Sequence, residues 1–479
     1  MRKTKIVCTL GPATDSEEVL KNLMLEGMNV ARINFSHGNY QDQEGRINMF
    51  KKVRDELKLP VSLLLDTQGP EIRIGKFAEN QIFLDKGQEF TLTNSDDLGD
   101  KTKVSITYKT LYQEIDVGRT ILVNDGTIEL EVKEIKDKDI VCEVIQGGKL
   151  TNRKSINIPD FIVTLPGITE KDIADIKYGI TAGFDYIAAS FVRKPQDVIE
   201  IREVLKQNGG EHIKIISKIE NREGIDNFDK ILDVSDGIMV ARGDLGVEIP
   251  MEEVPIFQKE FIKKTYRQGK PVITATQMLE SMISNPRPTR AEVSDVANAI
   301  YDGSSSIMLS GETASGEFPV ECVKTMSRIA LRIENSVKYW KRFKTREYEL
   351  KDMSTECIMN YAVCTTAMNV DAKAIIAYTN TGDTPRIVSS FGPGCPIFAI
   401  TQNEVIYRQL GLCWGITPKL FEPQPNIDVL LHKGLDKLRE EKYLNEGDKV
   451  VIAGGTKVLT DVPTEELKQN IVMGGVVEV

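Results

Sequence analysis

Charged and polar side chains follow directly after several short apolar segments in this sequence. If those segments are parallel strands of one barrel, their carboxyl ends share one rim, which is where barrel enzymes hold their reactive groups. A barrel with a purely structural role would have no reason to collect such groups there. The side chains concerned are Asn34, Ser36, His37, Asp66, Thr67, Lys218, Glu220, Arg242, Asp244, Thr276 and Gln277.

Two carboxylates among them could share a metal ion. In Lys-Ile-Glu-Asn at 218–221, strand alternation directs Lys218 and Glu220 to the same side, toward the barrel axis. Taken alone, this pair could be an internal ion pair, and Asp244 could equally be a helix N-cap. Together, two converging carboxylates repel unless a cation lies between them, so Glu220 and Asp244 predict a site for a hard divalent ion, Mg²⁺ or Mn²⁺.

Positive charge near this site indicates phosphoryl transfer. Arg32, Arg73, Lys218 and Arg242 would surround the metal with cations, which is what phosphoryl oxygens require as they gain and redistribute charge. Each of these residues alone is more often a solvated surface side chain. The glycine-rich turn at Gly243 and the amides that begin the following helix could hold a small carboxylate, because unpaired backbone N–H groups attract anions.

The elements that would position these groups are strands and helices in alternation. Helical segments follow most of the apolar segments. One example is 15–26, which ends before Gly27. A doubly wound sheet is the competing architecture, but no glycine-rich dinucleotide loop follows the first segment. The count of eight predicts an α/β fold with a (β/α)8 TIM barrel. The eight segments are 5–10, 29–35, 61–67, 186–191, 214–219, 237–241, 271–276 and 305–310.

Two further regions accompany the predicted barrel, which occupies 1–68 and 167–340. Residues 69–166 contain six short segments separated by Gly, Asn and Asp, which predicts an inserted all-β lid domain over the barrel mouth. A charged linker at 341–351 then leads into a C-terminal α/β domain, 341–479, with a probable regulatory and oligomerisation role. The six lid segments are 81–84, 89–93, 103–107, 120–123, 128–135 and 140–145. The C-terminal strands are expected at 374–378, 396–400, 415–419 and 449–453, with a helix at 426–438.

Composition excludes several classes of protein. The net charge of −10 disfavours nucleic-acid binding, and no segment has the apolar length needed to span a membrane. The seven cysteines are scattered, with no C-x-x-C pair, so neither a disulfide framework nor a zinc site is indicated. We therefore expect a cytoplasmic protein that binds neither nucleic acid nor membrane.

Longer motifs resemble those of one enzyme family, pyruvate kinase, over nearly the whole chain and in consistent order. The most specific are Ala-Arg-Ile-Asn-Phe-Ser-His-Gly at 31–38, Asp-Thr-Gln-Gly-Pro-Glu-Ile-Arg at 66–73 and the fifteen-residue stretch at 285–299. The resemblance implies transfer of the phosphoryl group of phosphoenolpyruvate to ADP, giving pyruvate and ATP, the last step of glycolysis. Further matches are 3–14, 218–221, 241–248, 275–282 and 309–314.

Residue roles follow from the same resemblance. Glu220 and Asp244 would bind Mg²⁺, Lys218 would neutralise the phosphoryl group in flight, and Arg32 would hold phosphate oxygens. Thr276 would order the water that protonates the enolate, because its hydroxyl is no strong acid at neutral pH. Arg32, Arg73, Lys218 and Thr276 would be catalytic, and Arg32, Lys218, Gly243, Asp244 and Thr276 would contact substrate. Asn34, Ser36, Asp66 and Thr67 would bind K⁺, and Asn34, His37, Arg73 and Lys154 would contact ADP or ATP.

Other consequences of the resemblance concern ions, effectors and assembly. Glu71 matches the K⁺-dependent type of the family, whereas Lys there tends to replace the ion. A phosphorylated effector could bind the loop from Thr379 to Thr384, although an ordinary capped turn explains that loop equally well. Gln68 departs from the usual Lys, and the family suggests a homotetramer. Two other functions compete with this one. A barrel aldolase or lyase would need no lid, and an inactive paralogue should have lost Lys218 or its partners.

Overall fold

The computed structural model describes residues 1–36, 38–346, 353–424, 427–455 and 472–479. Its centre is a closed barrel of eight parallel strands, in the order β1-β17-β16-β15-β14-β13-β3-β2. Each strand lies within one of the eight apolar segments, so the TIM-barrel prediction is confirmed. The strands are β1 (Lys5–Thr9), β2 (Val30–Asn34), β3 (Ser62–Asp66), β13 (Tyr186–Ala189), β14 (Lys214–Ile219), β15 (Gly237–Ala241), β16 (Val272–Ala275) and β17 (Ser306–Leu309).

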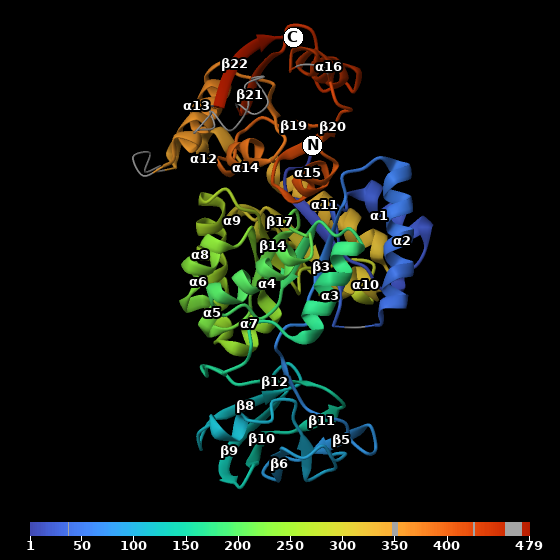
Figure 1. Cartoon of the computed structure of the whole chain (residues 1–479), viewed down its shortest axis with the longest axis vertical. Coiled ribbons are helices and arrows are strands. Elements are labelled where there is room, and N and C mark those ends of the chain that lie inside the picture. Colours follow the sequence, from blue (N-terminus) through green and yellow to red (C-terminus); the bar gives the residue numbers. More distant parts are fainter. Residues whose placement is uncertain (37, 347–352, 425–426, 456–471) are drawn as a thin grey trace.

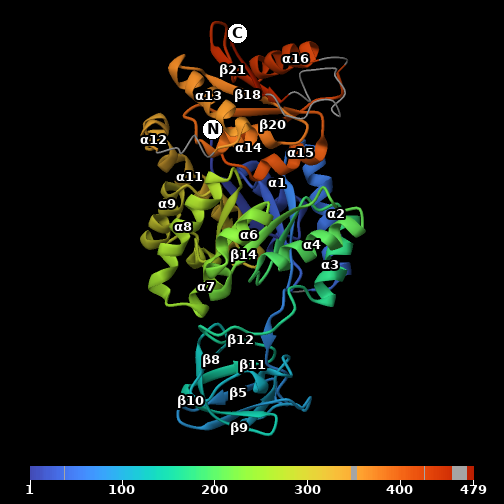
Figure 2. The same cartoon turned by 60° about the vertical axis from the view of Figure 1, so that its left-hand side comes forward.

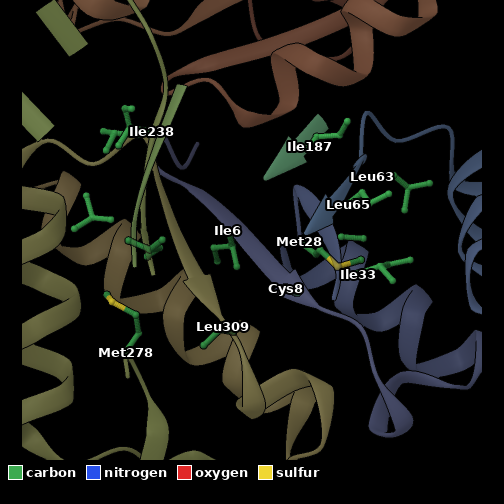
Figure 3. Packing of buried hydrophobic residues seen from close by; sticks show 14 of the residues in the cluster. Ile6, Cys8, Met28, Ile33, Leu63, Leu65, Ile187, Ile238, Met278 and Leu309 are labelled. Carbon is green, nitrogen blue, oxygen red and sulfur yellow. The ribbon is translucent and has the colours of Figure 1, made fainter. Parts of the chain in front are cut away.

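Side-chain alternation divides the barrel residues into two cores. On β3, Leu64 points into the barrel interior, where a small cluster of buried residues fills the axis. Leu63 and Leu65 point outward into the larger core between strands and helices, which Figure 3 shows together with Ile6 and Cys8 of β1. Truncating such a buried leucine to alanine costs about 2–5 kcal/mol. The rim is therefore held by packing on both sides of every strand.

A ring of helices covers the outside of the barrel (Figure 1). The first begins after Ser16 and ends at Gly27, whose φ of 123° favours glycine, as expected from the sequence. Three short helices begin directly at strand ends on the rim: α5 (Arg222–Asp226), α7 (Arg242–Glu248) and α10 (Gly311–Ala314). The outer helices are α1 (Glu17–Glu26), α2 (Tyr40–Leu57), α3 (Glu170–Thr181), α4 (Pro195–Gln207), α6 (Phe228–Val234), α8 (Val254–Arg267), α9 (Arg290–Asp302) and α11 (Pro319–Glu334).

The insert between β3 and α3 forms a separate β structure beyond the rim, at the bottom of Figures 1 and 2. A seven-stranded sheet and a two-stranded sheet enclose a hydrophobic core of their own. All six expected segments contain strands, but β4, β11 and β12 were not anticipated. The strands are β4 (Ile72–Arg73), β5 (Gln81–Leu84), β6 (Glu89–Thr93), β7 (Lys103–Ser105), β8 (Thr120–Val123), β9 (Ile128–Lys136), β10 (Asp139–Gln146), β11 (Gly148–Thr151) and β12 (Ser155–Asn157).

The C-terminal region lies at the opposite end of the barrel (Figure 2) and has a five-stranded sheet in the order β20-β19-β18-β21-β22. The side chain of Leu412 joins the cluster inside the barrel, and the Tyr186 hydroxyl donates to the Gln409 carbonyl, 2.6 Å away. This region therefore closes the amino ends of the strands. Its elements are β18 (Ala374–Tyr378), β19 (Ile397–Thr401), β20 (Ile416–Leu420), β21 (Lys449–Gly455), β22 (Val472–Glu478), α13 (Thr355–Asn369), α14 (Asp383–Ser390), α15 (Glu404–Gln409) and α16 (Ile427–Glu440).

One expectation for this region was wrong. Residues 341–351 were interpreted as a linker, but 341–345 belong to the helix α12 (Tyr339–Thr345), and 347–351 lie outside the described residues. Phe343 is buried in the C-terminal core, and Trp340 packs edge-on against it, so two aromatic anchors outweigh the surrounding charges. The strand β22 was also not expected. No helix in the described parts of the chain has the length and apolarity to cross a membrane.

Candidate active site

Strand alternation places the predicted polar groups inside the upper end of the barrel. On β2, β3 and β14, the inward side chains of the lower layer are Val30, Leu64 and Ile216. The next inward positions, two residues further along each strand, belong to Arg32, Asp66 and Lys218. Hydrogen bonds from Arg32 and Lys218 to Asp66 show that these three side chains meet just above the apolar plug.

Asp66 joins the two cations of this layer. Its Oδ2 accepts a hydrogen bond from Arg32 Nε at 2.5 Å, and its Oδ1 accepts from Lys218 Nζ at 3.1 Å. Ser190, which follows β13, also donates to Asp66 and accepts from Lys218 Nζ at 2.7 Å. Arg32 Nη1 donates to Thr9 Oγ1. Asp66 is only 1% exposed, so the network is shielded from solvent.

Burial and charge act in opposite directions on the pKa values of this network. Burial raises the pKa of Asp66, but Arg32 and Lys218 more than compensate, and the net pKa is lowered. For Lys218, burial lowers the pKa, yet Asp66, Glu220 and Asp244 together raise it above the ordinary value. Both groups are therefore charged at neutral pH, and Lys218 is a permanent cation rather than a proton donor.

Glu220 follows β14 and has an incompletely satisfied carboxylate. Its Oε2 accepts the backbone N–H of Phe191 at 2.5 Å, and its Oε1 lies 2.9 Å from Lys218 Nζ. That ammonium lacks the alignment of a hydrogen bond to Oε1, which is buried without another donor among the described residues. Burial, together with the charge of Asp244 in the first turn of α7, raises the pKa of Glu220. A buried carboxylate oxygen whose one close partner is an ammonium, with the charge of Asp244 near enough to raise its pKa, fits a metal cation.

The predicted monovalent-ion ligands converge at the ends of two neighbouring strands. Asn34 of β2 is the register partner of Asp66 of β3, and Thr67 is the next residue. The Asn34 side chain accepts the backbone N–H of Ser36 at 2.9 Å, which curls the chain over the strand end. These oxygens are the hard ligands that an alkali cation requires. His37 lies outside the described residues.

The predicted nucleotide contacts lie on the lid side of the rim. Arg73 ends β4, where it pairs in register with Ser155 of β12, the residue after Lys154. Its guanidinium binds Glu71, with Nε 2.8 Å from Oε2, and donates to the Arg153 carbonyl. Burial raises the pKa of Glu71, although Arg73 opposes this shift. The fold thus places Arg73 at the end of one lid strand and Lys154 directly before the strand that pairs with it.

Thr276 and Gly243 come together from β16 and β15. The backbone N–H of Gly243 donates to Thr276 Oγ1 at 2.8 Å. The hydroxyl proton of Thr276 in turn points to the Ala275 carbonyl at 2.6 Å. A small cavity lies elsewhere, between the barrel and the C-terminal region, whereas Gly243, Asp244 and Thr276 line the open cleft at the mouth. We take the cleft as the candidate site because it holds the reactive groups.

Comparison with known proteins agrees with this geometry. A family model described as the pyruvate kinase barrel domain matches residues 1–323. The chain belongs to the pyruvate kinase family. The pyruvate kinase α/β domain model matches residues 359–466.

Relatives named pyruvate kinase match the chain nearly end to end. The protein from Clostridium acetobutylicum is 47% identical over 473 residues, covering 98% of this chain and all of the relative. That from Clostridium perfringens is 47% identical, covering 95% and 96%. That from Bacillus licheniformis is 48% identical, and the match covers the whole chain and 81% of the relative.

The structure also corrects the view of one residue in this pyruvate kinase family member. Arg242 was grouped with the cations that face phosphoryl oxygens, but its guanidinium is engaged by Asp295, Thr276 and Ala275. Sequence reasoning did not identify Ser190 or Asp295. Ser190 follows a barrel strand, so the rule that found Asp66 would have found it. The position of Asp295 in the sequence does not indicate that it binds Arg242.

Proposed function

We propose that the protein transfers the phosphoryl group of phosphoenolpyruvate to ADP, giving pyruvate and ATP, the last step of glycolysis. The observation that carries this proposal is the buried network Arg32–Asp66–Lys218, with Glu220 beside it, on the catalytic rim of the barrel. A lactate-dehydrogenase-coupled assay with phosphoenolpyruvate and ADP, with and without Mg²⁺, tests it directly. Absence of pyruvate formation with both substrates and Mg²⁺ would exclude this function.

Glu220 and Asp244 would hold the divalent ion, Mg²⁺ or Mn²⁺. The unsatisfied oxygen of Glu220 and the pKa-raising effect of Asp244 support this assignment. Among residues the structure describes, no cluster of three or more His, Cys, Asp or Glu forms a complete metal cage. The remaining ligands would be water and substrate oxygens, as is common for Mg²⁺. When bound, the ion supplies positive charge against the phosphoryl oxygens.

Lys218 and Arg32 would act on the phosphoryl group itself. The Lys218 ammonium is fixed by Asp66 and Ser190, so it does not reorganise as charge moves from one oxygen to another. Arg32 uses Nε and Nη1 for Asp66 and Thr9, while its Nη2 has no partner in the described part of the chain. That nitrogen can donate to a phosphate oxygen without breaking the network, which is why we assign Arg32 and not Arg242 to phosphate binding.

Thr276 would orient the water that protonates the enolate of pyruvate. Its hydroxyl donates to Ala275 and accepts from Gly243, which leaves one lone pair. Toward the cleft, Thr276 can therefore only accept a hydrogen bond, and an O–H of a bound water can supply it. Gly243 and Asp244 would contribute the substrate-carboxylate end of the site, where α7 presents backbone amides.

The K⁺ and nucleotide sites are proposals of the same kind. The register pairing of Asn34 with Asp66 supports a K⁺ site formed with Ser36 and Thr67. Arg73, on a lid strand next to Lys154, would reach the nucleotide phosphates when the lid closes. His37 and Asn34 would complete the ADP or ATP contacts.

Domain roles and assembly extend the proposal beyond the site. We infer a catalytic barrel at 1–68 and 167–340, a lid at 69–166 and a regulatory, oligomerising domain at 341–479, in a cytoplasmic homotetramer. All seven cysteines are free, as suits a reducing compartment.

An effector phosphate would bind the segment from Thr379 to Thr384, whose last two residues begin α14. The Thr379 hydroxyl already accepts the amides of Thr381 and Gly382, as in an ordinary capped turn, so a ligand would have to replace these bonds. Titration with sugar phosphates and nucleotide monophosphates, while substrate saturation is followed, tests whether any effector acts.

A further inference from the structure

Thr276 has an unfavourable backbone conformation. Its φ is 71°, and that of the following residue, Gln277, is 53°, so two consecutive residues with side chains lie in the left-handed region. A β-branched residue is rarely found there, because its side chain crowds the backbone. Such a conformation persists only where the surrounding structure holds it. The question is therefore what holds Thr276.

Arg242, the residue after β15, binds the backbone on both sides of the Thr276 Cα atom. Its Nε donates to the carbonyl of Ala275 at 3.3 Å, and its Nη2 donates to the carbonyl of Thr276 at 2.6 Å. These two carbonyls belong to the peptide groups that flank Thr276. One guanidinium thus fixes both of them, which restricts rotation about the φ and ψ of this residue.

Asp295 fixes the guanidinium in turn. Its Oδ1 accepts from Arg242 Nη1 and its Oδ2 from Nη2, both at 2.7 Å, the parallel arrangement that is the most directional ion pair of proteins. Gln258 of α8 accepts a weaker bond from Nη1 at 3.4 Å. Asp295 belongs to α9, so an outer helix of the barrel is connected through Arg242 to the end of β16.

The Thr276 hydroxyl shares these partners. It donates to the same Ala275 carbonyl that Arg242 Nε binds, and it accepts from Gly243, the neighbour of Arg242 in sequence. Any rotation of the peptide between Ala275 and Thr276 would therefore move the hydroxyl as well. The direction of its one free lone pair depends on Arg242.

We propose that Arg242 and Asp295 are positioning residues for the protonation step, acting through Thr276. The inference rests on the proposed role of Thr276 in orienting a water. In that step a water O–H bond breaks and a C–H bond forms at the methylene carbon of the enolate, while solvent returns a proton to the hydroxide. The Thr276 lone pair accepts one O–H of that water, which points its other O–H toward the carbon. The Arg242–Asp295 pair holds this lone pair in place.

The test separates protonation from phosphoryl transfer. Pyruvate in D₂O, with the metal ions and phosphate present, reports protonation as deuterium incorporation into its methyl group, followed by NMR. For Arg242→Lys and Asp295→Asn we expect this exchange to fall by about tenfold or more, since misplacement of an oriented group has effects of that size or larger. KM for phosphoenolpyruvate and ADP should change far less. Equal losses in exchange and in substrate binding would overturn the proposal.

A double-mutant cycle decides whether Arg242 acts through Thr276. Thr276→Ala alone should slow exchange, and adding Arg242→Lys to it should slow exchange little further, because the two residues share one function. If Arg242→Lys is equally harmful with and without Thr276, the pair does not act through the hydroxyl. If Thr276→Ala leaves exchange intact, the role of Thr276 fails and the inference fails with it.

Arg202→Lys is the matched control. Arg202 also binds an aspartate, Asp236 at 3.0 Å, and a backbone carbonyl, that of Val234, but away from the cleft. Its loss should leave the exchange rate unchanged, and an equal loss of exchange in this variant would overturn the inference. Pyruvate formation by the unaltered protein is measured in the same experiment, so failure of the overall function would be seen separately.

Discussion

Lys218 Nζ lies 2.9 Å from Glu220 Oε1, at the carboxyl end of one barrel strand. Lys218 and Glu220 form a group with Asp66, Asp244 and Arg32. This group has three carboxylates and two cations, so its formal charge is −1 when all are ionised. A divalent cation changes this to +1. We therefore expect the site to attract a metal ion first and a phosphorylated substrate afterwards, because the barrel fixes these charges in place.

Replacement of Lys218 tests its charge in phosphoryl transfer. We expect Lys218→Met to lower kcat by about a hundredfold or more, because it removes a preorganised cation from the transition state. Mn²⁺ affinity should change little, since Glu220 and Asp244 remain. Coupled kinetics and Mn²⁺ titration measure the two effects.

Lys264→Met, which removes a surface ion pair with Asp229 on the outer helices, is the control and should keep normal kcat. Near-normal kcat in Lys218→Met would contradict the role.

Asp66→Asn should destabilise the fold in a pH-dependent way. Removing one partner of a buried ion pair costs about 3–5 kcal/mol, because the other charge stays buried. The pKa of Asp66 is lowered in the folded protein, so its contribution is complete above its ordinary value of 3.8 and is lost as pH falls through the lower folded value. The difference in Tm between Asp66→Asn and the unaltered protein should therefore be constant near neutral pH and shrink in acid.

A surface carboxylate provides the comparison for Asp66. Asp55→Asn removes an exposed partner of Arg54 and should shift Tm only slightly at any pH. A difference for Asp66→Asn that grows as pH falls would have the wrong sign for a carboxylate with a lowered pKa.

Activity should depend on K⁺. Asn34 and Asp66 are register partners at the ends of neighbouring strands, and Glu71 is an anion paired with Arg73, so position 71 supplies no ammonium in place of the ion. We expect kcat to fall strongly when tetramethylammonium replaces K⁺, and Glu71→Lys to reduce this dependence by supplying an ammonium. Full activity in tetramethylammonium without K⁺ would refute the monovalent-ion site.

Asn157 of the lid donates to Glu248 at the end of α7, 2.7 Å away, and connects the lid to the helix that carries Asp244. Asn157→Ala should raise KM for ADP more than KM for phosphoenolpyruvate, because Arg73 and Lys154 lie on the lid. Steady-state kinetics with each substrate varied would detect this difference. Equal changes in both KM values would argue against a link between this bond and the nucleotide.

The same contact predicts a pH effect on stability. Burial, with a contribution from Asp244, raises the pKa of Glu248 to about 7. Ionising a carboxyl group whose pKa is raised in the folded protein lowers the free energy of unfolding. This loss is absent below the unfolded pKa and complete above the folded pKa. Glu248→Gln should therefore increase Tm relative to the unaltered protein at about pH 8 more than at about pH 5. A constant difference in metal-free protein would contradict the raised pKa.

The sequence by itself determined the fold class and most of the site. Eight β-branched segments with polar ends are a local pattern, and the period of two that buries Leu64 also directs Asp66 inward. Lys218 and Glu220 could be assigned to one face for the same reason. The short strands β4 and β12 could not be foreseen, because their pairing, not their sequence, makes them strands.

Only the tertiary structure decided which charges are free and which are engaged. Arg32 and Arg242 both look like free cations of the barrel rim in the sequence, yet Arg242 is bound by Asp295 of α9, fifty-three positions away. α12 likewise formed where the sequence suggested a linker, because Phe343 found a buried site in the C-terminal core. Alternation along a strand is fixed by local backbone geometry, whereas ion pairs and buried anchors depend on which distant elements the folded chain brings into contact.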